Sequence, residues 1–177
     1  MSDIATADPL TALRGGLDDL ESLITAMSSE RYAVNPAPGF SSGVGPHVRH
    51  CLDHVESLMD GFERGNPIDY DARHRGAPEE TDRQAGLDRL GRIRVRLDDL
   101  DCDPGRHCEI RVMVSPDEPA RLVPSSRLRE MLYVFQHTIH HLALMSAIAR
   151  SLGVPLDDDI GRAPSTRADD RRRSCAR

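Results

Sequence analysis

Residues 9–29 read PLTALRGGLDDLESLITAMSS, and this stretch decides the fold class. Its apolar side chains recur in alternating steps of three and four residues, which places them along one face of an α-helix. The members of this stripe are Leu10, Leu13, Leu17, Leu20, Ile24 and Met27. Because a helix with one apolar face must bury that face against other elements, the stretch predicts a helix that packs in a bundle.

The same periodicity predicts three further helices. Each begins near a residue type that caps or opens helices, and each ends at a glycine or a proline-glycine turn. Their expected limits are Ser41-Ser42 to Gly61 or Gly65, Pro78 or Thr81 to Asp103-Pro104-Gly105, and Ser125 or Ser126 to Gly153. The sequence therefore predicts an all-α protein built as a four-helix bundle.

The connections between these helices differ in character. Residues 65–78 are rich in glycine, proline and charge, and their length predicts a crossover loop rather than a tight turn. Residues 108–123 alternate apolar and polar side chains around a proline-bounded turn, which predicts a short β-hairpin before the last helix. We expect residues 1–160 to form a single domain and residues 161–177 to form a flexible tail.

Composition limits the kinds of partner. The chain has 177 residues, 38% of them hydrophobic, and a formal charge of −6, which argues against a nucleic-acid-binding surface. We find no run of about 18 apolar residues, so we expect no membrane span and no membrane partner. The four cysteines form no C-x-x-C pair and nothing indicates secretion, so a reduced protein of the cytoplasm is the expectation.

Histidines interrupt the apolar stripe of the last helix. His137 and His141 are four residues apart, so both lie on one helix face and can converge on one ion. The same face carries Val134, Leu144 and Ile148, which places these histidines in the bundle interior. A bound metal ion would satisfy nitrogens that burial leaves without water.

A second group of histidines lies on the second predicted helix. His47, His50 and His54 fall within about 60° of one another on a helical wheel, so at least one can meet the pair on the last helix. Three imidazoles with one open position are a common zinc site, and nickel or iron(II) accepts the same ligands. By spacing alone, His47 and His54 lie closer to the apolar stripe than His50 does.

Two stretches resemble a known family. Residues 44–54 (VGPHVRHCLDH) and residues 137–141 (HTIHH) resemble the second-helix and last-helix signatures of the DinB-like (YfiT-like) superfamily. Residues 160–166 (IGRAPST) resemble a tail motif of one uncharacterised branch. The resemblance implies an up-down-down-up four-helix bundle and a divalent metal ion held by three histidines. Matched residue by residue, these are His50, His137 and His141.

The resemblance also implies a class of chemistry. Characterised members of the superfamily include thiol-dependent transferases and isomerases that use low-molecular-weight thiols. The additional histidines His47, His54 and His140 depart from the three-histidine pattern and leave the ligand on the second helix open. We expect them to relay protons or to orient a ligand, as catalytic residues.

The expected function is therefore that of a divalent-metal-binding protein, a thiol S-transferase, isomerase or hydrolase that activates a thiol or water for a small-molecule substrate. One alternative is a non-catalytic or stress-related protein with a structural or sensory metal. Another is a metal-free interaction module whose histidines form a hydrogen-bonded core. A bundle of this size is also compatible with a homodimer.

Two residues outside the histidine groups receive a structural interpretation. Tyr70 falls in the crossover loop, where a solvated surface position is the expectation. Glu130 precedes His137 by seven residues, two helical turns away, and we expect it to form an ion pair with a nearby arginine.

Overall fold

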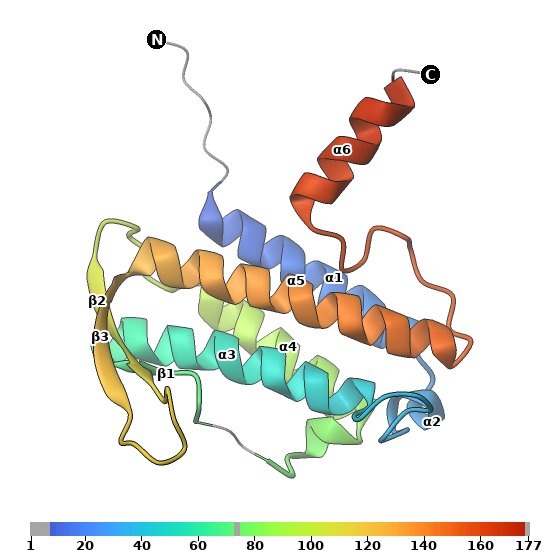
Figure 1. Cartoon of the computed structure of the whole chain (residues 1–177), viewed down its shortest axis with the longest axis horizontal. Coiled ribbons are helices and arrows are strands. Elements are labelled where there is room, and N and C mark those ends of the chain that lie inside the picture. Colours follow the sequence, from blue (N-terminus) through green and yellow to red (C-terminus); the bar gives the residue numbers. More distant parts are fainter. Residues whose placement is uncertain (1–7, 73–74, 176–177) are drawn as a thin grey trace.

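The computed structural model describes residues 8–72 and 75–175, in which four long helices carry the fold (Figure 1). The helices are α1 (Pro9–Ala26), α2 (Ser29–Tyr32), α3 (Val44–Arg64), α4 (Arg83–Asp98), α5 (Arg127–Ser151) and α6 (Pro164–Cys175), with a 3-10 turn η1 (Pro78–Glu80). The strands are β1 (Ile68–Asp69), β2 (His107–Val112) and β3 (Arg121–Ser126).

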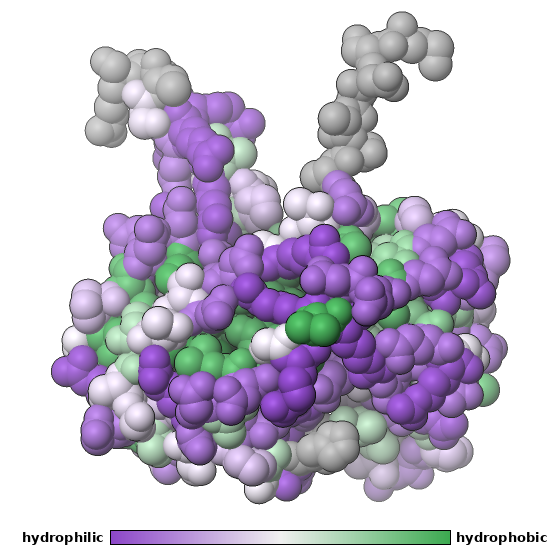
Figure 2. Space-filling model, turned by 180° about the vertical axis from the view of Figure 1, so that it is seen from behind, coloured by the Kyte–Doolittle hydropathy of each residue, from purple (hydrophilic) through white to green (hydrophobic). Residues whose placement is uncertain are grey.

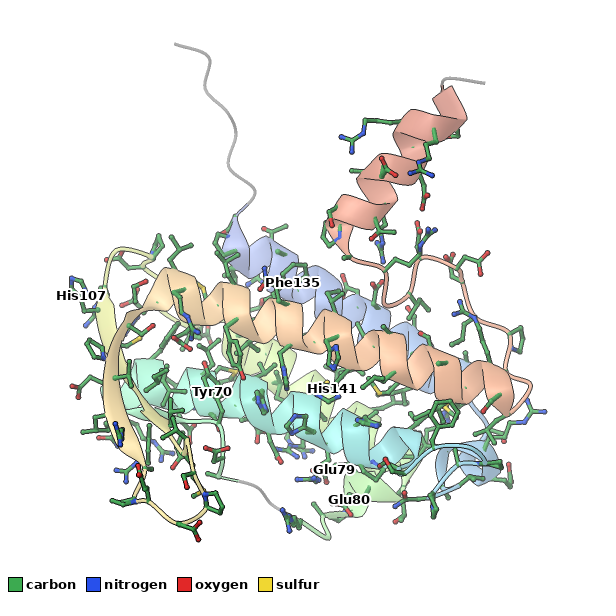
Figure 3. All side chains as sticks on the ribbon, viewed as in Figure 1. Tyr70, Glu79, Glu80, His107, Phe135 and His141 are labelled. Atoms are coloured by element: carbon green, nitrogen blue, oxygen red, sulfur yellow. The ribbon has the colours of Figure 1, made fainter. Side chains whose placement is uncertain are left out.

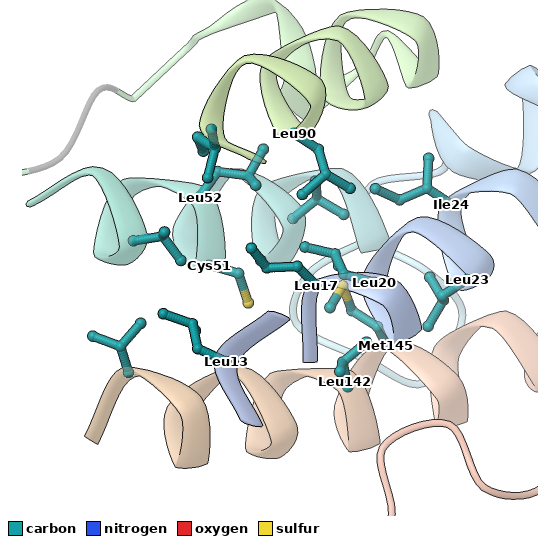
Figure 4. Packing of buried hydrophobic residues seen from close by; sticks show 14 of the residues in the cluster. Leu13, Leu17, Leu20, Leu23, Ile24, Cys51, Leu52, Leu90, Leu142 and Met145 are labelled. Carbon is teal, nitrogen blue, oxygen red and sulfur yellow. The ribbon is translucent and has the colours of Figure 1, made fainter. Parts of the chain in front are cut away.

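The four long helices pack side by side around an aliphatic core. Helix α1 contacts α4 and α5, and α3 contacts the same two helices. In Figure 1, α1 and α5 run in one direction and α3 and α4 run in the other. The apolar stripe of α1 faces inward, and Figure 4 shows its leucines packed against α3, α4 and α5. Helices α3 and α5 are therefore antiparallel neighbours.

The prediction of an all-α four-helix bundle was wrong, because the described residues also form a three-stranded mixed sheet with the order β1-β2-β3. Strands β2 and β3 pair antiparallel, as the alternating residues 108–123 predict, while β1 pairs parallel with β2. Ile68 lies opposite Ile110 in that pairing, and both side chains are buried. A two-residue strand has no readable period, so the sequence predicted only a loop there.

The chain after residue 160 is the segment expected to form a flexible tail. It contains helix α6, which stands away from the bundle in Figure 1. Gly161 has a φ of 79°, and a Cβ there would lie 2.5 Å from the backbone nitrogen of Ala143, so only glycine brings the chain this close to α5. Arg167 then forms an ion pair with Asp19 of α1 at 2.9 Å. These two contacts anchor the segment to the bundle.

One face of the molecule is largely hydrophilic. Figure 2 shows one face on which hydrophilic residues surround small hydrophobic patches. Within residues 8–72 and 75–175, no helix combines the length and apolar character that crossing a membrane requires.

Candidate metal centre

The seam between α3 and α5 gathers histidines from both helices. His47, His50 and His54 come from α3, and His137 and His141 come from α5. We call these five residues the histidine cluster. Because the helices are antiparallel, the N-terminal turns of α3 meet the C-terminal half of α5. Figure 3 shows His141 in this seam, with Tyr70 farther along it.

The nitrogens of the cluster converge on His137. Its Nε2 lies 2.9 Å from Nε2 of His50 and 3.2 Å from Nε2 of His141. One imidazole nitrogen carries either a proton or a lone pair, so it cannot form two full hydrogen bonds to two other imidazole nitrogens. A cation can accept lone pairs from several of these nitrogens at once. The arrangement is therefore suited to a metal ion.

Three histidines meet the spacing that a single ion requires. His50, His54 and His137 each offer a nitrogen, and these three atoms lie within 4.8 Å of one another. Two nitrogens bound to one tetrahedral zinc ion lie roughly 3.3 Å apart, given Zn–N distances of about 2.0–2.1 Å. The three side chains are thus close enough to bind a metal ion after small rotations.

The orientation of His54 adds to this geometry. Its Nδ1 lies 3.0 Å from the backbone carbonyl oxygen of His50, one helical turn earlier. A carbonyl oxygen only accepts, so Nδ1 carries the proton and donates it, and the lone pair of the neutral ring is on Nε2. Metal-bound histidines commonly donate their second ring N–H to a carbonyl in this way. This hydrogen bond within α3 therefore leaves the lone pair on Nε2 of His54 available to a metal ion.

His141 and His47 form the other end of the cluster. The Nδ1 atoms of the two rings are 3.0 Å apart. Burial, followed by the nearby His137, His47, His140 and His54, lowers the pKa of His141 to about 3. Burial and the nearby His140 also lower the pKa of His47. Both rings are therefore neutral at pH 7, the state in which an imidazole can bind a metal ion.

His140 lies beside the cluster but on the exposed side of α5. Its ring centroid is 5.3 Å from that of His141 and 6.4 Å from that of His137. The cluster itself is mostly covered, since His54 and His141 are only 4% and 9% exposed.

The structure thus gathers five of the six histidines that the sequence singled out and places the sixth, His140, at the edge. His50 and His137, predicted as ligands, lie together. The third histidine within 4.8 Å of both is His54, which we expected to relay protons or orient a ligand, with the ligand on the second helix left open. His141, the third ligand implied by the resemblance, lies next to His137, with the two Nε2 atoms 3.2 Å apart.

Aromatic rings extend the cluster toward the hairpin. The ring of Tyr70 stacks on His54, with centroids 5.1 Å apart and planes at 16°. Tyr133 of α5 stacks on His137 at 5.6 Å and contacts Tyr70 at 5.1 Å. Tyr70 is therefore part of the seam, and the expectation of a solvated loop position was wrong.

The phenol of Tyr70 meets a buried carboxylate. Its hydroxyl donates to Oε2 of Glu130 at 3.0 Å, and Glu130 is 0% exposed. Arg129 pairs with Oε1 of the same carboxylate at 2.7 Å, which confirms the expected ion pair. Burial, and then the charge of Glu130, raises the pKa of Tyr70 well above its usual range, so the phenol stays protonated and donates. The sequence did not predict this contact, because Tyr70 and Glu130 are 60 positions apart.

Comparison with known proteins adds one similarity. FK506-binding protein 5 of Rhizopus delemar is 32% identical to this chain over 116 residues. The match covers 64% of this chain but 30% of the relative, so the chain spans less than a third of that protein's length. No family model matches the chain.

Proposed function

We propose that this protein binds one divalent transition-metal ion through His50, His54 and His137 and uses it to activate a thiol or a water molecule. The observation that carries the proposal is the meeting of these three histidines, from two antiparallel helices, within 4.8 Å. Imidazole ligands suit zinc, nickel and iron(II), so the ion belongs to this group.

Such an ion would supply Lewis acidity, lowering the pKa of a thiol or water at an open coordination position. The chain's own residues provide the rest of the chemistry. The two ring nitrogens of His141 lie 3.2 Å from His137 and 3.0 Å from His47, so this ring can pass on a proton released beside the ligands by taking it at one nitrogen and releasing it at the other. His47 contacts His141, and the exposed His140 lies beside His137 and His141. Together these three residues offer a route for the proton from the site to solvent.

The resemblance of residues 44–54 and 137–141 to the DinB-like superfamily supports a thiol as the activated group. Under this proposal the protein is a metal-dependent thiol transferase, isomerase or hydrolase of the cytoplasm that acts on a small molecule. Cys51, Cys102 and Cys108 are free thiols, which agrees with a reducing compartment.

A second candidate function rests on His141. Its Nε2 is close enough to His137 for His141 to become a fourth ligand beside His50 and His54. Four histidines would close a tetrahedral site, and closed sites are structural or sensory rather than catalytic. The two functions therefore differ in whether an exchangeable position remains.

The first test is metal content, measured by mass spectrometry on protein purified without a nickel column. We expect about one ion per wild-type chain, and loss of the ion in His50→Ala, His54→Ala and His137→Ala. His107→Ala is the matched control, because His107 is exposed on β2 and lies outside the cluster. Absence of metal in the wild type, even after reconstitution with zinc, nickel and iron(II), would refute the proposal.

The variant His141→Ala separates the two functions. If His141 only accepts protons, the variant keeps its ion, and a thiol added to the cobalt-substituted wild type changes the visible absorption spectrum. If His141 is the fourth ligand, the variant binds the ion more weakly, and the wild-type spectrum does not respond to thiols. Retention of metal by His54→Ala together with its loss in His141→Ala would favour the ligand set that the resemblance implies.

A further inference from the structure

Glu130 is a fully buried carboxylate that lies near the histidine cluster but outside it. It is 0% exposed on α5, two turns before His137. Three donors surround it: the hydroxyls of Tyr70 and Ser125 and the guanidinium of Arg129. Burial of an ionised carboxylate is unfavourable unless such partners are present, so the site is built to hold this charge in place.

Tyr70 connects this carboxylate to the cluster. Its hydroxyl is fixed by Glu130, while the face of its ring stacks on His54. The segment that carries Tyr70 is itself held: Asp69 of β1 pairs with Arg111 of β2, and Asp71 accepts a hydrogen bond from the backbone N–H of Met113. Tyr70 therefore has little freedom to move away from His54.

His54 is thus fixed from two directions. The hydrogen bond from Nδ1 to the carbonyl of His50 sets one edge of the ring, and the phenol ring of Tyr70 covers one face. An imidazole ring free to rotate about its side-chain bonds would lose conformational entropy on binding an ion, whereas a ring already fixed would not. Fixing the ring in advance should therefore strengthen metal binding.

We propose that Tyr70 and Glu130 are positioning residues that hold His54 in the orientation required of a metal ligand. This inference rests on the proposed function, since it assigns these two residues to the same metal centre. Groups that orient metal ligands typically change metal affinity by 10–100-fold when they are removed. The alternative is that the pair only fastens the β1 segment to α5 and contributes to folding alone.

The experiment compares cobalt(II) binding in the wild type, Tyr70→Phe, Tyr70→Leu and Tyr32→Phe, using competition with a chelator and visible absorption spectra. Tyr32→Phe is the matched control: the hydroxyl of Tyr32 is also buried and donates to the backbone carbonyl of Glu79 at 2.6 Å, but it lies away from the cluster. Each tyrosine-to-phenylalanine variant therefore loses one buried hydroxyl contact.

We expect Tyr70→Phe to bind cobalt about tenfold more weakly and Tyr70→Leu, which also loses the stacked ring, to approach a hundredfold. The absorption bands at saturating cobalt should change in both, while Tyr32→Phe keeps wild-type affinity and bands. Equal affinity and identical spectra for wild type and Tyr70→Phe would overturn the inference while leaving the proposed function intact. No cobalt binding by the wild type would overturn both.

The part played by Glu130 is tested with Glu130→Gln, alone and combined with Tyr70→Phe. If Glu130 acts through the phenol, the double variant binds cobalt no more weakly than Tyr70→Phe. If Glu130→Gln weakens binding by the same factor in both backgrounds, Glu130 acts independently of Tyr70, and its assignment as a positioning residue through Tyr70 is wrong.

Discussion

Helix α3 carries two buried polar clusters on adjoining faces, and they are built on opposite principles. Toward α4 and η1, Arg49 and Arg89 meet Asp53, Glu56 and Glu79, with Arg89–Asp53 at 2.7 Å and Arg49–Asp53 at 2.8 Å. We call this the ion-pair network. Toward α5, the histidine cluster brings together groups of a single chemical type.

The two clusters differ in how the charges within them are balanced. In the ion-pair network, each charge has an oppositely charged neighbour supplied by the chain. In the histidine cluster, protonation of one ring disfavours protonation of the next, and the converging nitrogens offer lone pairs to a common point. The first balances its charges with residues of the chain itself, whereas the second presents several imidazole nitrogens to one region, an arrangement that would suit a cation.

The largest expected effect comes from breaking the ion-pair network. Arg89→Met removes the cation between Asp53 and Glu79, which are 3% and 6% exposed, and leaves buried carboxylates with less compensation. We expect the free energy of unfolding in urea to fall by about 3–5 kcal/mol. Arg94→Met is the control: Arg94 lies on α4, as Arg89 does, but pairs with the exposed Asp18 of α1, so its loss should cost about 1 kcal/mol or less. Equal losses in the two variants would contradict the contrast.

The next effect comes from removing the ion. With free zinc at 100 times its dissociation constant, binding to the native state should stabilise the wild type by about 2.7 kcal/mol, and a chelator should abolish this gain. The free energy of unfolding of His137→Ala should be the same with and without chelator. Arg94→Met, which leaves the histidine cluster intact, should be stabilised by zinc as the wild type is. A wild-type melting temperature unaffected by chelator would instead favour a metal-free histidine core.

The sequence predicted the parts of the fold that depend on long periodic stretches. The apolar stripe of α1 repeats over several turns and the other long helices show the same period, so these helices were found from local pattern alone. Strand β1 has two residues and α2 has four, too few to display a period. Helix α6 has few apolar residues, and contacts from distant residues such as Asp19 anchor it.

The sequence predicted which histidines form the candidate site better than it predicted the role of each one. Spacing identified both histidine groups, but a helical wheel cannot set the register of α3 against α5. That register brings His137 of α5 within 4.8 Å of His50 and His54 of α3, and it pairs His47 with His141. Tyr70 enters the site because β1 pairs with β2, a contact between segments about 40 residues apart that no local pattern reveals.

The smallest expected effect is a pH dependence of the free energy of unfolding that comes from the histidine cluster, measured in protein stripped of metal. The pKa of His141 is lowered to about 3 in the folded state, whereas the unfolded chain has the ordinary value of about 6.5. The unfolded state therefore binds this proton more readily, so the stability due to His141 is present above pH 6.5 and is lost as the pH falls below it. Between pH 7.5 and pH 5.5 we expect a loss of about 1 kcal/mol in the free energy of unfolding from this residue. His141→Asn, which has no titrating ring, should show a correspondingly smaller loss over the same interval. An identical loss in wild type and His141→Asn would mean that His141 titrates alike in the folded and unfolded chains, and that the cluster does not hold it neutral.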